Sequence, residues 1–219
     1  AGILVSAFRH DLARPLEAPT PEFARACRRL CDEADAALIL DDVRAGFRLH
    51  LGGSWEPLGV RPDLSAFSKA IANGWPLAAV TGNDRFREAA TKVFVTGSFW
   101  YAGAPMAAAV TTIRELHAID GPEHMRRMGQ RLRDGLEAQA ARHGFQLIQS
   151  GPPQMPMVQF RDDPDCVLGE AFCREALARG VYLHPRHNMF LSAAHQDRDI
   201  DEALEATDDA FKALARSRG

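Results

Sequence analysis

The first forty residues contain two short apolar runs and, between them, one amphipathic segment. Residues 3–7 and 37–40 are almost entirely apolar, which is typical of short strands that are buried on both faces. Between them, Thr20-Pro21-Glu22 resembles a helix start, with threonine as N-cap, proline in the first turn and an early acid. The predicted helix has an apolar stripe made by Phe23, Cys27, Leu30, Cys31 and Ala34. Strand, helix and strand in this order predict a parallel α/β sheet covered by helices.

Further strands and two long helices are predicted after this unit. Residues 63–67 and 77–81 are expected to form two strands, separated by a short turn or helix that Asn73-Gly74 ends. An alanine-rich helix is predicted from Pro105 to about Ala118. A second long helix is predicted over residues 122–143, and Gly144 closes it.

The pattern changes after this helix. Short apolar runs alternate with helical segments, which predicts a small α+β domain. The expected strands are 145–149, 155–160, 181–183 and 190–192, and the expected helices are 166–179 and 197–216. We therefore expect a large-domain portion over residues 1–120, a connecting helix over 121–143 and a small C-terminal domain over 144–219.

Composition excludes several classes of protein. The 219 residues are 46% hydrophobic and 25% charged with a net charge of −3, which excludes wholesale disorder and argues against a nucleic-acid-binding surface. No run approaches the ~20 apolar residues that span a bilayer, and the first residues do not resemble a signal peptide. The cysteines lack the paired spacing of a zinc site and are expected to be reduced and buried: Cys27, Cys31, Cys166 and Cys173. We expect a cytoplasmic protein that binds neither membranes nor nucleic acids.

Two adjacent carboxylates, Asp41 and Asp42, follow the apolar run 38–40. In a parallel sheet the carboxyl ends of the strands face the ligand crevice. Two acids there must pair with cations, bind a metal or be partly protonated. A magnesium site of a nucleotide hydrolase would also need a GxxxxGK[ST] loop, and the sequence has none.

Lys69 is the second candidate for chemistry. Only three of the 26 basic residues are lysines, namely Lys69, Lys92 and Lys212. Lys69 directly follows a predicted strand among small and apolar neighbours, so partial desolvation is expected to lower its pKa and favour the nucleophilic amine. An amine beside an Asp at a sheet end is the arrangement of pyridoxal phosphate enzymes, where the amine forms a Schiff base and the carboxylate keeps the pyridine nitrogen protonated. From the spacing alone, a structural lysine whose stem packs on apolar surface is the preferred interpretation.

Two ordered blocks resemble one known family. Residues 38–48, LILDDVRAGFR, are similar to the L-I-x-D-E-V-x-x-G-F-R block of class III pyridoxal-phosphate-dependent aminotransferases. Residues 59–64, GVRPDL, and 68–79, SKAIANGWPLAA, resemble that family's second block, G-V-x-P-D-L…x-K-x-I-x-x-G-x-P-x-x-A. The branch around glutamate-1-semialdehyde aminomutase is the most similar. The resemblance implies pyridoxal phosphate as cofactor and the fold type I (aspartate-aminotransferase-like) α/β architecture.

The resemblance also implies roles for individual residues. Lys69 would form the Schiff base and shuttle the proton of the substrate α-carbon, and Asp41 would pair with the pyridine nitrogen. Val43 would pack on a face of the ring, while Asp42 replaces the family's usual glutamate. A hydroxyl that binds the cofactor phosphate across a dimer interface is expected at Ser98, with Thr96 as the alternative.

Residues 183–192 occupy the place where family members finish the substrate pocket. Arg186 in this stretch is a candidate clamp for a substrate carboxylate, and an ordinary surface arginine is the alternative. The stretch has no acidic residue of the kind expected in a true aminomutase. We therefore predict amino-group transfer between an amino compound and a keto acid or aldehyde, with intramolecular amino transfer second.

The resemblance covers nearly the whole chain but only the C-terminal half of a family member. We expect this chain alone to form an incomplete active site and to associate with a second copy, with an N-terminal half-chain, or with both. The alternative from another class is a non-catalytic assembly subunit, or half of a split enzyme.

Overall fold

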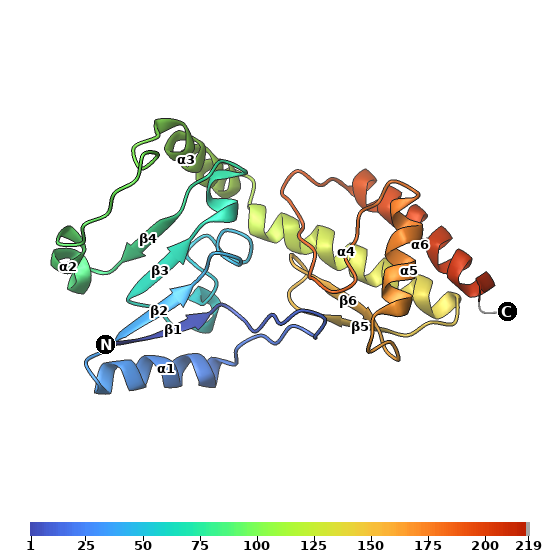
Figure 1. Cartoon of the computed structure of the whole chain (residues 1–219), viewed down its shortest axis with the longest axis horizontal. Helices are drawn as coiled ribbons and strands as arrows, with labels where there is room; N and C mark the ends of the chain where they lie inside the picture. Colours follow the sequence, from blue (N-terminus) through green and yellow to red (C-terminus); the bar gives the residue numbers. More distant parts are fainter. Residues whose placement is uncertain (218–219) are drawn as a thin grey trace. The chain divides into compact units, whose positions relative to one another are not determined.

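The computed structural model describes residues 1–217, which form two compact units (Figure 1). The first unit comprises Ala1–Phe8 and Pro19–Pro122, and the second comprises Arg9–Ala18 together with the chain from Glu123 onward. No helix within residues 1–217 is long and apolar enough to cross a membrane.

A four-stranded sheet organises the first unit, in the order β1-β2-β3-β4. The strands are β1 (Gly2–Ser6), β2 (Ala37–Asp41), β3 (Leu64–Phe67) and β4 (Ala79–Gly82). The first three are parallel, as the apolar runs predicted, but β4 pairs antiparallel with β3. The sheet is therefore mixed, because residues 68–78 are too few for the covered crossover that a parallel return requires.

Helix α1 (Pro21–Glu33) covers one face of this sheet along β1 and β2 (Figure 1). It begins as predicted, since the Thr20 side chain accepts a hydrogen bond from the backbone N–H of Phe23 at 3.2 Å. The buried cluster beneath it comprises Ala24, Cys27, Cys31, Leu38, Leu40, Trp55 and Val60. This core fixes the side of β2 on which Leu38 and Leu40 lie.

The remaining helical elements of the first unit are mostly short. They are η1 (Glu56–Leu58), η2 (Lys69–Ala72), η3 (Asp84–Phe86), α2 (Arg87–Thr91) and the long α3 (Gly103–Ala118). Helix α3 matches the alanine-rich segment and contacts η2.

The second unit packs three helices against a two-stranded antiparallel sheet (Figure 1). Its elements are α4 (Gly121–Arg142), β5 (Leu147–Ser150), β6 (Met157–Phe160), α5 (Val167–Leu177) and α6 (Asp197–Ser217). Phe145, Phe160 and Phe172 each contact the buried ring of Phe211, and the Phe172 and Phe211 centroids are 4.5 Å apart.

The strands predicted at 181–183 and 190–192 are wrong, because both segments are irregular. The Val181 N–H closes the end of α5 by donating to the Ala176 carbonyl at 3.0 Å, so it is not available to a sheet. The Leu191 N–H donates to the carbonyl of Gln154 at 2.9 Å without a ladder forming.

Residues 9–18 belong to the second unit although α1, which follows them, belongs to the first. The Ala13 N–H donates to the Arg186 carbonyl at 2.8 Å, and the Leu16 N–H donates to the Ser150 hydroxyl at 2.9 Å. The Gln159 side chain donates to the Ala13 carbonyl at 3.0 Å. These contacts across distant parts of the sequence fix the segment on β5 and β6.

Candidate functional site

The pairing of β2 with β3 brings Asp41 and Lys69 to the same edge of the sheet. Asp41 ends β2 and lies opposite Ala66, and β3 ends one residue later at Phe67. Because the two strands are parallel, their carboxyl ends share one edge. Lys69 follows two residues after β3, as the first residue of η2.

The Asp41 carboxylate is held by the backbone beyond it. Its Oδ1 accepts a hydrogen bond from the Val43 N–H at 3.1 Å, and the side chain is only partly buried. Burial lowers the pKa of the neighbouring Arg44, and the negative charge of Asp41 acts in the opposite direction. The Asp41 carboxylate is therefore accessible and lies near the cationic side chain of Arg44.

Asp42 is in a different environment from Asp41. It is 1% exposed, and its Oδ2 accepts a hydrogen bond from the Ser54 N–H at 2.8 Å. Burial raises the pKa of Asp42, hydrogen bonds from Ser54 oppose this, and the charge of Asp41 adds to it. The two adjacent acids are therefore in different environments, because Asp42 is buried with a backbone donor while Asp41 is only partly buried.

Lys69 has a backbone conformation that is unusual for its residue type, with φ +47°. Its side chain is exposed, and among residues 1–217 it has no hydrogen-bond or ion-pair partner. The expected desolvation of Lys69 is therefore wrong for this chain, because no apolar element covers the amine. Its neighbours Ile71 and Ala72 are buried, so the backbone of the short helix is anchored while the amine remains free to react.

The first sequence block packs against the end of β3, which lies between the two parts of the second block. The rings of Phe47 and Phe67 pack with centroids 5.1 Å apart. A Cβ on Gly46 would lie 2.6 Å from the Phe67 ring and 2.8 Å from the Asp42 carbonyl, so only glycine fits. The glycine and phenylalanine of the first block thus fix the end of β3, two residues before Lys69.

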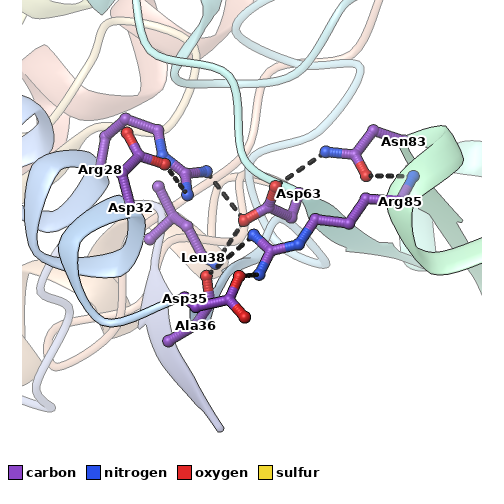
Figure 2. A network of polar contacts seen from close by, with 8 residues as sticks. All are labelled: Arg28, Asp32, Asp35, Ala36, Leu38, Asp63, Asn83 and Arg85. Atoms are coloured by element: carbon purple, nitrogen blue, oxygen red, sulfur yellow. Dashed lines mark hydrogen bonds and ion pairs between the residues drawn. The ribbon is translucent and has the colours of Figure 1, made fainter.

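Asp63, which sequence reasoning did not single out, anchors the opposite end of β3 (Figure 2). It is buried, and its Oδ2 accepts hydrogen bonds from the Arg28 guanidinium and the Leu38 N–H, both at 2.8 Å. Its Oδ1 accepts from the Asn83 side chain at 2.8 Å. One carboxylate therefore joins α1, β2 and the end of β4, and the P-D pair of the second block was the signal that could have pointed to it.

The network continues to the surface through Arg85 (Figure 2). The Arg85 backbone N–H donates to the Asn83 side chain, and its guanidinium pairs with Asp35 at 2.5 Å. These contacts tie the loop after β4 to the loop before β2. Together with Asp63 they hold the register that places Asp41 opposite Ala66.

The other predicted site residues lie in the turn after β2, in the segment between α2 and α3, and in the second unit. Val43 follows the Asp41–Asp42 pair in the turn after β2, and Ser98 and Thr96 lie exposed in the segment between α2 and α3. Arg186 belongs to the second unit, where its guanidinium pairs with Glu170 at 2.9 Å and donates to the Asp165 carbonyl at 2.9 Å. The proposed carboxylate clamp therefore already has an internal carboxylate partner.

Comparison with known proteins identifies the family. The model of the family "Aminotransferase class-III" matches residues 16–211. The chain belongs to the class III aminotransferases. In this family, the chain is 49% identical over 216 residues to the aminopentol aminotransferase of Sphingopyxis macrogoltabida, covering 99% of this chain and 51% of that relative. It is 34% identical over 215 residues to the glutamate-1-semialdehyde 2,1-aminomutase of Desulfatibacillum aliphaticivorans, covering 90% of this chain and 50% of that relative.

A solved structure at 49% identity has the same fold. The FumI protein of Sphingopyxis sp. MTA144, in its PLP internal aldimine form, superposes with a TM-score of 0.96 at 49% identity. The match covers 98% of this chain and 52% of that one. This confirms the predicted fold type I architecture and the family resemblance. The chain spans about half the length of the relatives it matches.

Proposed function

We propose that this chain carries the lysine and the aspartate of a pyridoxal-phosphate-dependent aminotransferase site. The observation that supports this most is the parallel pairing of β2 and β3, which puts the Asp41 carboxylate and the unpartnered Lys69 amine at one sheet edge. When bound, pyridoxal phosphate supplies an aldehyde that condenses with amines and a protonated ring that accepts electrons.

The chain's own residues would act on this group in three ways. Asp41, oriented by the Val43 N–H, keeps a proton on the pyridine nitrogen. Val43 offers an apolar side chain to a face of the ring. The Lys69 amine would hold the aldehyde covalently and, once released, would be available as the base that takes the proton of the substrate α-carbon. These residues suit pyridoxal phosphate because an accessible carboxylate and an unpartnered amine lie at the same edge of the sheet.

The proposed reaction moves an amino group from an amino donor to a separate keto acid or aldehyde. The relative that is 49% identical has an aminotransferase name, whereas the aminomutase relative is 34% identical. Residues 183–192 contain no acidic side chain. The four cysteines are free, and three are buried, which is consistent with a reducing compartment and with a cytoplasmic protein.

Selective capture of the cofactor tests the lysine assignment. The protein is incubated with pyridoxal phosphate, reduced with borohydride and mapped by peptide mass spectrometry. All three lysines are exposed, so Lys92 and Lys212 are internal controls for unspecific labelling. We expect the label on Lys69 to exceed that on either control by at least about tenfold, which corresponds to roughly 1.4 kcal/mol of selective binding. Equal labelling of the three lysines would contradict the proposal.

Ser98 is proposed to bind the cofactor phosphate of a neighbouring subunit. Replacing Ser98 by alanine is expected to weaken pyridoxal phosphate binding about tenfold, because one hydrogen bond to a charged oxygen is lost. Thr96→Val is the matched control, and affinity is measured by titration of the cofactor absorbance. Pyridoxal without phosphate should bind both variants equally. If Thr96→Val shows the loss and Ser98→Ala does not, the threonine is the phosphate ligand.

We further propose that the chain works only in association, with a second copy, with an N-terminal half-chain, or with both. On the sheet face opposite α1, Leu4 lies beside Ile39, and Ile39 lies beside Leu64 on the next strand; Leu4 is 67% exposed. On the same face Val80 is 72% exposed. Large apolar side chains also gather in the segment between α2 and α3, where Val93, Phe94, Val95, Phe99, Trp100 and Tyr101 are all exposed. So many exposed large apolar side chains support an interaction surface on this unit.

Light scattering at micromolar concentration tests the association. The chain is measured alone and co-expressed with the half of the Sphingopyxis relative that it does not match. We expect a complex larger than the 24.0 kDa monomer, with an interface of more than ~2,000 Å². Leu4→Glu should weaken the complex. Leu177→Glu, at an exposed position of α5, is the control and should leave the complex unchanged. A 24.0 kDa monomer that captures cofactor at Lys69 would refute the proposal.

A further inference from the structure

Asp42 is a buried acid that the proposed chemistry does not use. Its carboxyl group is 1% exposed, and the loop at Gly53 and Ser54 closes over it. Gly53 has φ +109°, and a Cβ there would lie 3.4 Å from the Asp42 Oδ2, so the loop backbone approaches the carboxyl closely. The Ser54 N–H completes the contact with a hydrogen bond of 2.8 Å.

The backbone of Asp42 is tethered on two more sides. Its N–H donates to the Ala66 carbonyl at 3.0 Å, which extends the contact between β2 and β3 beyond Asp41. Its carbonyl accepts from the Gly46 N–H at 2.8 Å, which closes the turn after β2. Three hydrogen bonds therefore fix one residue against β3, the turn and the loop at Ser54.

The position of Asp42 determines the position of the group that orients Asp41. The Asp41 Oδ1 accepts from the Val43 N–H at 3.1 Å, and that N–H belongs to the peptide that joins Asp42 to Val43. A shift of Asp42 would therefore move the donor that orients the Asp41 carboxylate. Val43, the proposed ring contact, would move with it.

We infer that Asp42 is a positioning residue: its carboxyl group, by accepting the Ser54 N–H, locks the 42–43 peptide that holds the Asp41 carboxylate toward the cofactor. The inference rests on the proposed function only where cofactor capture is the readout. The positioning role of Asp42 requires a side-chain oxygen that accepts a hydrogen bond, and it does not require a negative charge. The Asp42 Oδ1 is buried without a partner among residues 1–217, and a full charge there would be costly.

Two substitutions in the full chain separate this role from a general contribution to stability. Asp42→Ala removes the acceptor, while Asp42→Asn keeps an oxygen that can accept the Ser54 N–H. Amide hydrogen exchange is followed at Ser54 and at Val43, with the α1 amides as a report on the rest of the fold. We expect about tenfold faster exchange at both amides in Asp42→Ala, the effect of losing one buried hydrogen bond. Asp42→Asn should stay within about threefold of the unchanged chain.

Cofactor capture at Lys69 is the second readout and should fall about tenfold in Asp42→Ala and recover in Asp42→Asn. If the unchanged chain captures no cofactor, the proposed function fails, while exchange at Val43 still decides this inference. If Asp42→Ala does not fold, Gly53→Ala moves the loop and should speed exchange at Val43. Two results would overturn the inference. One is a folded Asp42→Ala variant in which the Val43 amide exchanges as slowly as in the unchanged chain. The other is an Asp42→Asn variant whose amide exchange and cofactor capture change as much as those of Asp42→Ala.

Discussion

Lys69→Arg is expected to reduce amino-group transfer by about 10⁴-fold or more in the assembly that carries the activity. Arginine keeps the positive charge, but a guanidinium cannot form a Schiff base and does not give up its proton at neutral pH. The substitution therefore removes both the covalent attachment and the proton shuttle, and a proton-transfer group alone contributes up to about 10⁴-fold. Turnover is followed as release of keto product from an amino donor.

Lys92→Arg is the matched control for this substitution. Lys92 is exposed at the C-terminal end of α2 and pairs with Glu88 at 2.6 Å, a contact that arginine can also make. Its activity should therefore equal that of the unchanged protein. A Lys69→Arg variant with more than about a tenth of normal turnover would assign the chemistry to another group, because a Schiff-base lysine cannot be replaced by arginine.

Asp63→Ala is expected to lower the free energy of unfolding of the first unit by about 3 kcal/mol, the loss that follows when one partner of a buried ion pair is removed. The Leu38 N–H and the Asn83 side chain lose their acceptor, and Arg28 retains only Asp32, at 2.7 Å. Denaturant unfolding followed by the emission of the buried Trp55, together with circular dichroism, measures the change. Because Asp63 fixes the register of β2 on β3, capture of cofactor at Lys69 should fall in parallel.

Asp35→Ala is the control within the same network. Asp35 pairs with Arg85, but its side chain is 96% exposed, so its removal should cost less than about 1 kcal/mol. An Asp63→Ala variant as stable as Asp35→Ala would show that the buried carboxylate is not an anchor.

The contribution of Asp63 should also depend on pH. Burial alone would raise the pKa of Asp63, but hydrogen bonds from Leu38, Arg28 and Asn83 outweigh it and lower the pKa below its usual value. A carboxyl whose folded pKa is depressed stabilises the fold above its unfolded pKa of about 3.9, and this stabilisation is lost as the pH falls through the folded pKa. The stability gap between the unchanged chain and Asp63→Ala should therefore narrow as the pH falls below about 4.

The sequence determined the local elements and the family. The apolar runs predicted β1 and β2, and Thr20 with its proline predicted the start of α1, because these signals act within a few residues. The two ordered blocks identified the class III aminotransferases, and residues of the two blocks contact each other across the fold, as Leu38 and Asp63 do. Periodicity was weakest where strands are short, which is why residues 181–183 were wrongly predicted as a strand.

Only the tertiary structure decided what surrounds each group. Asp41 and Asp42 are adjacent and chemically identical, yet the core beneath α1 and the loop at Ser54 bury one and leave the other accessible. The small neighbours of Lys69 predicted desolvation, but desolvation depends on what packs over the amine, and within residues 1–217 nothing does. The antiparallel direction of β4 and the placement of residues 9–18 in the second unit depend on hydrogen bonds between residues far apart in the sequence. Local patterns carry no information about such partners, so packing alone fixed them.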